Sequence, residues 1–159
     1  MKSGPSLRKR SSRPKAAQRK HAKVTSSDRA RAGLAQKLRV FVVEDHEATA
    51  HGLKMLLQLA GYTVEIAKDV ASATKFADRN KFDVLLCDLN LPDGNGWDLM
   101  EFLSAGDPVP AVAYSAYGEP EQIARSKAVG FAEHVVKGAD PEALIAALRR
   151  VAGRLASAG

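Results

Sequence analysis

The sequence predicts an α/β fold in which one parallel sheet is covered by helices on both faces. Five apolar runs of β-forming residues alternate with five helical patterns over residues 38–159, the order that is typical of a parallel sheet. The third run, residues 82–87, is almost wholly apolar, as a strand covered on both faces should be. Polar side chains follow four of the runs directly, and the carboxyl ends of parallel strands meet at one edge. We therefore expect a doubly wound, five-stranded sheet with a polar site at that edge.

Individual elements follow from hydrophobic spacing and from residues that start or stop helices. Strands are predicted where β-branched and aromatic residues run together, at residues 39–43, 63–67, 82–87, 110–114 and 133–136. Helices are predicted where apolar residues recur every three or four positions, at residues 46–60, 69–79, 96–104, 119–129 and 141–156. Gly61 ends the first helix, Asp69 begins the second, and Asp140 followed by Pro141 begins the last. Residues 88–95 are expected to form a loop.

Several apolar positions are assigned to the core by their place in these patterns. Cys87 ends the central strand and is expected to be a small core residue. Leu99, Phe102 and Leu103 are expected to face inward, and Leu155 is expected to be buried by the last helix. Trp97 opens the third helix next to the predicted site. It either partly covers the site or packs against the core, and we favour packing.

The net charge of +6 conceals two segments of opposite charge. Residues 1–37 contain twelve Lys or Arg and one Asp, whereas residues 38–159 carry a net charge of −5. The basic segment has few apolar residues and no aromatics, so we expect a disordered tail joined to a folded domain at 38–159. The tail either lacks a dedicated partner or makes weak contact with nucleic acid or an anionic surface. Without aromatics, base stacking is not supported.

Cysteine content and hydropathy point to a cytoplasmic protein. No run approaches the roughly 18 apolar residues of a membrane span, and no apolar stretch follows the basic N-terminus, so a secretory signal is not expected. The single Cys87 excludes an internal disulfide and fits a reducing compartment.

The predicted site brings together carboxylates, a hydroxyl and an ammonium group. Glu44 and Asp45 follow the first strand, Asp88 the third, Ser115 the fourth and Lys137 the fifth. Repelling carboxylates favour cation binding, and oxygen ligands suit Mg²⁺. We assign Asp45 and Asp88 as direct Mg²⁺ ligands, and we expect Glu44 to act on the ion through a bound water molecule. Asp88 is the candidate nucleophile for a phosphoryl group, whose oxygens Lys137 and Ser115 would contact.

Each of these residues also has an ordinary structural explanation. Asp45 and Ser115 could cap the helices that follow them, Asp88 could belong to a turn, and Lys137 could be a solvated strand end. Each explanation is plausible for one residue. The occurrence of such residues at four strand ends favours a common site.

The same residues resemble the receiver domain of two-component response regulators. The matching segments are residues 42–47, 88–96, 115–116 and Lys137, and the resemblance covers residues 38–156. It implies a flavodoxin-like sheet with strand order 2-1-3-4-5, Asp88 as phosphoacceptor, and the backbone carbonyl of Asn90 as a further Mg²⁺ ligand. It also implies a phosphohistidine donor, which would be a histidine kinase or a histidine phosphotransfer protein.

Two positions depart from the family pattern. Gly138 stands where the family usually has proline, so the preceding peptide bond is expected to be trans. His134 stands where the family usually has Tyr or Phe. It is either a surface histidine or part of a polar, pH-sensitive switch with Ser115. Tyr114 and Tyr117 are aromatics that could partly replace the missing ring.

The leading hypothesis is a stand-alone signalling switch that acts on a downstream protein and has no enzymatic turnover of its own. One alternative is an aspartate-nucleophile phosphatase, but such enzymes carry a second Asp where this chain has Asn90. Another alternative is a protein that binds nucleic acid through residues 1–37; salt-dependent DNA binding lost on deleting them would support it.

Overall fold

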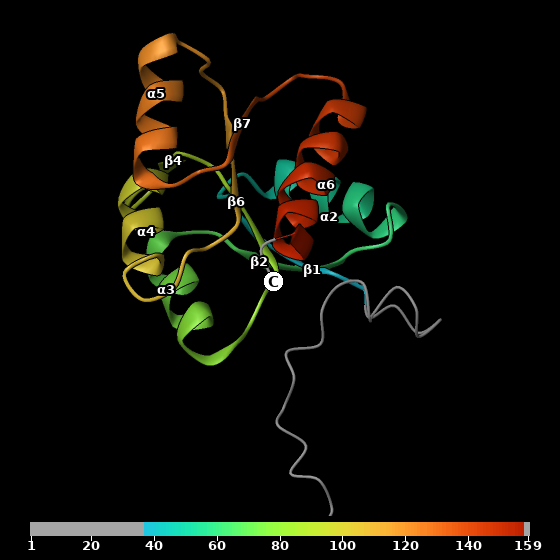
Figure 1. Cartoon of the computed structure of the whole chain (residues 1–159), viewed down its shortest axis with the longest axis horizontal. Coiled ribbons are helices and arrows are strands. Elements are labelled where there is room, and N and C mark those ends of the chain that lie inside the picture. The colour runs from blue at the N-terminus through green and yellow to red at the C-terminus, as the bar shows by residue number, and fades with distance from the viewer. Residues whose placement is uncertain (1–36, 158–159) are drawn as a thin grey trace, which may run out of the picture.

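The structure, a computed structural model, describes residues 37–157, and the predicted disordered tail at 1–37 lies, apart from Lys37, outside the described residues. Five parallel strands form one sheet between two layers of helices (Figure 1). The strands are β1 (Arg39–Val43), β2 (Thr63–Ala67), β3 (Val84–Cys87), β6 (Ala111–Ser115) and β7 (Glu133–Val136). The helices are α2 (Glu47–Leu59), α3 (Val70–Arg79), α4 (Gly96–Leu103), α5 (Pro120–Val129) and α6 (Pro141–Ser157).

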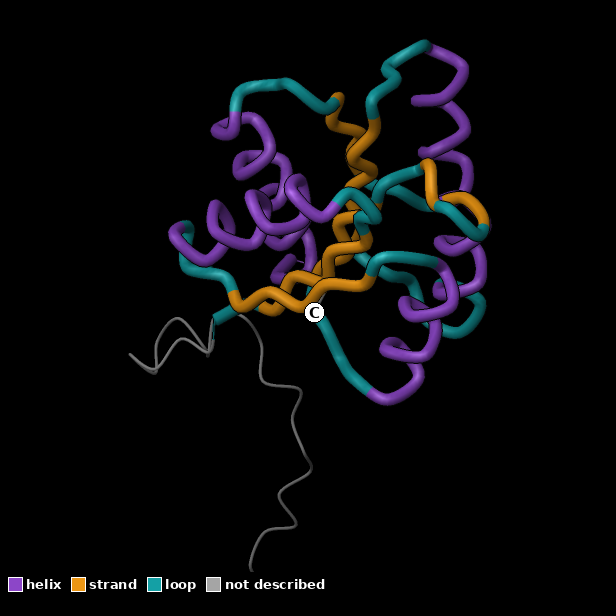
Figure 2. Tube along the Cα trace, turned by 180° about the vertical axis from the view of Figure 1, so that it is seen from behind, coloured by secondary structure: helices purple, strands orange, loops and turns teal. Residues whose placement is uncertain are grey.

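The order of the strands in the sheet is β2-β1-β3-β6-β7, and every pairing is parallel. This is the predicted order 2-1-3-4-5, because β4 (Asn90–Leu91) and β5 (Gly94–Asn95) pair only with each other. The antiparallel hairpin β4–β5 stands apart from the sheet (Figure 2). It lies within residues 88–95, which the sequence predicted to be a loop, so that prediction was wrong in part.

Alternating residues of each strand build a core on each face of the sheet. On β1, for example, Val40 and Val42 face the core beneath α2 and α6, whereas Phe41 and Val43 face the core beneath α3, α4 and α5 (Figure 1). Phe41 also stacks on Phe76 of α3, with ring centroids 4.4 Å apart. Both faces of the central strands are therefore covered, and only their ends reach solvent.

Two aspartate carboxylates hold the first turn of α3. Asp69 accepts a hydrogen bond from the backbone N–H of Ser72 at 2.7 Å and caps α3. The carboxylate of Asp93, from the hairpin β4–β5, accepts from the N–H groups of Val70 and Ala71 at 2.8 and 3.0 Å. Because these are free donors of the first helical turn, Asp93 ties the segment after β3 to the start of α3.

Two residues expected in the core are exposed. Phe102 is 58% exposed and Leu155 is 42% exposed, whereas Met100 is buried. A spacing of three or four residues allows either Phe102 or Met100 to face the core. In the structure α4 packs against the sheet with Met100 on the buried side. Cys87 is buried, as predicted, and Trp97 packs against the core beneath α4. Across residues 37–157, no helix has the length and apolar character needed to cross a membrane.

Candidate functional site

The polar residues predicted to form a site lie together at the carboxyl edge of the sheet. Backbone hydrogen bonds hold two of them in place: Glu44 N–H donates to Ala67 O at 3.0 Å, and Asp88 N–H donates to Val43 O at 2.8 Å. The predicted site residues line an open pocket of about 350 Å³ between the ends of β1, β3, β6 and β7. Its lining residues are Glu44, Asp45, His46, Thr49, Asp88, Asn90, Ser115, Ala116, Tyr117 and Lys137.

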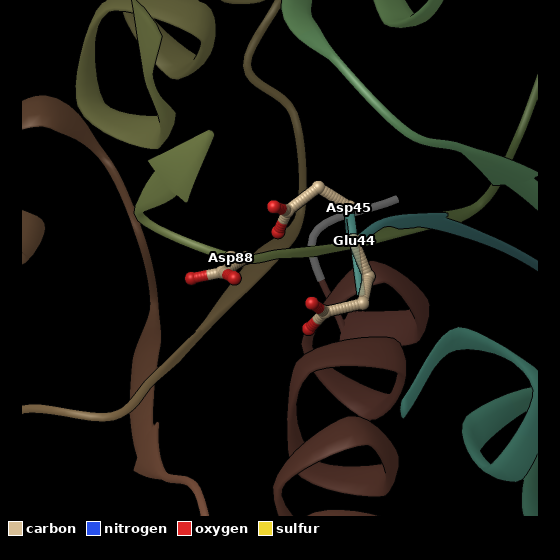
Figure 3. A group of neighbouring side chains, drawn as sticks. All are labelled: Glu44, Asp45 and Asp88. Atoms are coloured by element: carbon tan, nitrogen blue, oxygen red, sulfur yellow. The ribbon is translucent and has the colours of Figure 1, made fainter. Parts of the chain in front are cut away.

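Three carboxylates converge in this pocket. Glu44 and Asp45 reach from the end of β1 toward Asp88 at the end of β3 (Figure 3), and one oxygen from each lies within 4.8 Å of the others. Glu44 is 2% exposed and Asp88 is 6% exposed, while Asp45 is exposed. Like charges this close repel one another unless a cation lies between them.

Lys137 supplies part of the compensating charge. Its Nζ lies 2.7 Å from Glu44 Oε2 and 2.8 Å from Asp88 Oδ2, so it bridges the ends of β1 and β3. Partial burial acts to lower the pKa of Lys137, but the hydrogen bonds to Asp88 and Glu44 outweigh this effect and hold the pKa above its ordinary value. The pairing with Glu44 was not predicted, because no sequence pattern shows which carboxylate a lysine at a strand end will contact.

Glu44 is the least exposed of the three carboxylates. Burial raises the pKa of Glu44 and outweighs the lowering by Lys137 and by the backbone N–H of His46, which donates to Glu44 Oε1 at 3.1 Å. The nearby charge of Asp88 raises the pKa of Glu44 further. The predicted role of Glu44 toward a metal, acting through water, stays a prediction.

The Asp88 carboxylate is held at both oxygens. Its Oδ1 accepts from the backbone N–H of Asn90 at 3.0 Å, and its Oδ2 accepts from Lys137. The side chain cannot swing without losing one of these contacts. Asn90 lines the same pocket, and the role of its carbonyl as a metal ligand stays a prediction.

Ser115 is buried at the end of β6, and its Oγ accepts a hydrogen bond from the backbone N–H of Tyr117 at 3.2 Å. It does not cap α5, which begins at Pro120 and whose N-cap, Glu119, makes no side-chain hydrogen bond. The structural explanation offered for Ser115 is therefore wrong. Ser115 lines the same pocket as Asp88.

Gly138, the residue after Lys137, has a backbone conformation that proline could not adopt. No peptide bond within residues 37–157 is cis, as predicted for the Lys137–Gly138 bond, and Gly138 has φ +90°. This left-handed conformation is open to glycine and closed to proline, whose ring fixes φ near −65°. Lys137 N–H donates to Ser115 O at 2.7 Å, which continues the pairing of β6 with β7.

His134 is not a surface histidine of the kind the sequence allowed. It is half-buried on β7, and both ring nitrogens have partners: Nδ1 lies 3.1 Å from Ser126 Oγ, and Nε2 lies 2.9 Å from Tyr117 O. Ser126 is fully buried on α5. Sequence reasoning did not identify Ser126, because a serine within a helix gives no signal that distinguishes a buried position from an exposed one.

Comparisons with known proteins bear on the sequence and on the fold. The sequence pattern of the response regulator receiver domain matches residues 40–149. The transcriptional regulatory protein CusR of Escherichia coli K12 is 30% identical over 101 residues, or 63% of this chain and 44% of CusR. The chain spans about half the length of the curated bacterial relatives that it matches.

Solved structures of receiver domains have the same fold. The non-phosphorylated HemR receiver domain of Leptospira biflexa superposes with a TM-score of 0.68 and 33% identity, over 73% of this chain and 94% of that one. The chemotaxis protein CheY4 of Vibrio cholerae superposes with a TM-score of 0.68 and 31% identity, over 72% of this chain and 98% of that one.

Proposed function

Because this chain belongs to the family of response regulator receiver domains, we propose that it is a phosphorylatable switch of a two-component phosphorelay. The phosphoacceptor is Asp88, and the donor is a phosphohistidine on a histidine kinase or a histidine phosphotransfer protein. The exchange takes place in the cytoplasm. The chain then acts by binding a downstream protein, and it does not turn over a substrate of its own.

The observation that carries this proposal is the position of Asp88 within the pocket. Its carboxylate is held by Asn90 and Lys137, and Asp88 lines the same pocket as Ser115. A carboxylate oxygen attacks phosphorus, the bond from phosphorus to the imidazole nitrogen breaks with its electron pair on nitrogen, and an acyl phosphate forms. Lys137 and the Ser115 hydroxyl contact the phosphoryl oxygens.

The residues present fit a divalent cation. Three carboxylates have oxygens within 4.8 Å of one another, and the one lysine of the pocket pairs with two of them, Glu44 and Asp88, so negative charge exceeds positive charge in the pocket. Their donor atoms are all oxygen, the set that Mg²⁺ prefers. Asp45, Asp88 and the carbonyl of Asn90 would hold the ion directly, and Glu44 would act through water. The bound ion would neutralise charge on the transferring phosphoryl group.

Phosphorylation is tested with acetyl phosphate and Mg²⁺, followed by mass spectrometry of the intact protein. We expect the parent to gain one phosphoryl group and Asp88→Asn to gain none, since an amide is not a nucleophile toward phosphorus. Asp107→Asn, an exposed aspartate in the segment between α4 and β6, serves as the matched control and is expected to be labelled like the parent. Labelling that persists in Asp88→Asn would place the phosphoacceptor elsewhere.

Mg²⁺ is expected to raise the melting temperature of the parent. An ion that binds only the folded state stabilises it by mass action, by about 2.7 kcal/mol at a concentration one hundred times the dissociation constant. The measurement is thermal unfolding with EDTA and with millimolar MgCl₂. Asp45→Asn, which removes an exposed carboxylate ligand, is expected to lose most of the shift. An equal shift in Asp45→Asn and the parent would contradict the assignment.

A further inference from the structure

A chain of hydrogen bonds runs from the segment after β6 across β7 and α5 to α4. The Tyr117 carbonyl lies 2.9 Å from His134 Nε2, and His134 Nδ1 lies 3.1 Å from Ser126 Oγ. Trp97, near the start of α4, donates its indole N–H to the same Ser126 Oγ at 3.0 Å. Because Ser126 is 0% exposed, its hydroxyl depends on these two partners rather than on water.

When the imidazole of His134 is neutral, only one arrangement of hydrogens satisfies all of these hydrogen bonds. A carbonyl oxygen only accepts, so Nε2 of His134 carries the hydrogen and donates it to Tyr117. Nδ1 then has a lone pair and accepts from the Ser126 hydroxyl, whose oxygen accepts from the Trp97 indole. Each donor meets one acceptor, and the geometry therefore specifies the tautomer of His134.

The other end of the chain reaches the candidate phosphorylation site. Tyr117 N–H donates to Ser115 Oγ at 3.2 Å, so the backbone of Tyr117 is held on one side by Ser115 and on the other by His134. A movement of the Ser115 side chain toward a phosphoryl group on Asp88 either carries Tyr117 with it or leaves the Tyr117 N–H without its acceptor. Both outcomes disturb the bond from the Tyr117 carbonyl to His134.

At its far end the chain reaches the surface formed by α4 and α5. The guanidinium of Arg125, an exposed residue of α5, lies 4.0 Å from the centroid of the Trp97 ring. This is the distance of a cation–π contact. The Trp97 side chain therefore contacts Ser126 through its indole N–H and Arg125 through the face of its ring.

We propose that the Tyr117 backbone, His134 and Ser126 transmit the state of the phosphorylation site to the Trp97–Arg125 pair, with His134 as a positioning residue. This inference rests on the proposed function, since it takes phosphorylation of Asp88 as its input. This coupling differs from one made by the packing of an aromatic ring at position 134, because it depends on specific hydrogen-bond donors and acceptors. The face of α4 and α5 that carries Trp97 and Arg125 then differs between the two states.

The coupling is tested by the emission of Trp97, the single tryptophan of the chain. Acetyl phosphate and Mg²⁺ are expected to shift the emission maximum of the full-length parent, while mass spectrometry counts the phosphoryl groups. Ser126→Ala and His134→Phe, each checked for folding by circular dichroism, are expected to take up phosphate and show no such shift. Tyr117→Phe keeps the backbone carbonyl and is the matched control, with a shift like that of the parent.

The outcomes separate the two proposals. Phosphate uptake by the parent without any change in Trp97 emission overturns the coupling and leaves the proposed function intact. A shift that survives in Ser126→Ala and in His134→Phe also overturns the coupling. No uptake of phosphate at Asp88 overturns the proposed function and the coupling with it.

The tautomer of His134 is tested without phosphorylation. In ¹⁵N-labelled protein, two-bond correlations of the imidazole nitrogens are expected to show the hydrogen on Nε2 and a bare Nδ1 for His134. In Ser126→Ala, the Nδ1 resonance is expected to shift because its donor is gone. A hydrogen on Nδ1, or an unchanged resonance in Ser126→Ala, contradicts the chain.

Discussion

Replacing Lys137 with Met is expected to lower the free energy of unfolding by about 3 kcal/mol in EDTA, the low end of the range for removing one partner of a buried ion pair. The ammonium group lies 2.7 and 2.8 Å from the carboxylates of Glu44 and Asp88. Without this ammonium group, the carboxylates of Glu44 and Asp88 have lost their positively charged partner. Both are nearly buried, and both lie next to Asp45. The measurement is urea unfolding at neutral pH. Lys75→Met, a change at an exposed position of α3, is the control and is expected to stay within about 0.5 kcal/mol of the parent.

The effect of Lys137→Met depends on pH, and the sign follows from Glu44. The folded state holds the pKa of Glu44 above its ordinary value of 4.5, mainly by burial. Between 4.5 and that raised pKa, the folded state binds more protons than the unfolded state. The free energy of unfolding therefore falls as pH rises through this window. Loss of Lys137 should steepen this fall, and Glu44→Gln should flatten it.

A second comparison distinguishes charge compensation from simple packing. Asp88→Asn keeps the pair between Lys137 and Glu44 and removes one of the repelling carboxylates, so it is expected to be at least as stable as the parent in EDTA. If Lys137→Met unfolds with the free energy of the parent, or if Asp88→Asn is clearly less stable, then repulsion among these carboxylates is not what Lys137 relieves.

Replacing Gly96 with Ala is expected to cost about 3 kcal/mol, the upper part of the range for an overpacked core. A Cβ at this position would lie 2.5 Å from the backbone oxygen of Asp88 and 3.0 Å from Leu89 Cα. Both are backbone atoms of the segment that carries Asp88, so neither can move aside alone. We also expect slower labelling by acetyl phosphate, because α4 must shift away from the end of β3. Urea unfolding and the rate of phosphorylation measure the two effects.

Gly52 provides the matched control for Gly96. It lies within α2, and a Cβ there would have no atom within 4 Å. Gly52→Ala is therefore expected to raise the free energy of unfolding by about 0.5–1 kcal/mol, through the better helix propensity of alanine. Equal effects of the two substitutions would show that the close approach of α4 to β3 does not limit position 96.

The sheet could be predicted because its strands have strong local signals. Runs such as residues 40–43 and 84–87 are apolar throughout, and strand ends gather at one edge once the strands are parallel. The hairpin β4–β5 could not be predicted, because strands of two residues are too short to show any alternation. Phe102 was misplaced since helical spacing leaves the rotation of a short helix open by one residue.

The sequence indicated which residues gather at the site, but it did not indicate all of the contacts that they make there. Residue type and position at a strand end identify Asp88 and Lys137 as neighbours, but the bridge from Lys137 to Glu44 depends on the register of four strands, β1, β3, β6 and β7. The chain through His134, Ser126 and Trp97 joins β7, α5 and α4, and no spacing in the sequence relates these residues. Such long-range polar contacts are set by tertiary packing alone.

The placement of Lys137 after the last strand of the sheet has a consequence for biosynthesis. Chains emerge from the ribosome starting at the N-terminus, so Glu44, Asp45 and Asp88 are all made before the ammonium group that bridges two of them. A nascent polypeptide that ends before residue 137 has every acidic group of the cluster and lacks this counterion. Newly made protein is therefore expected to become fully stable only after translation has passed β7 and the final helix has closed over the sheet.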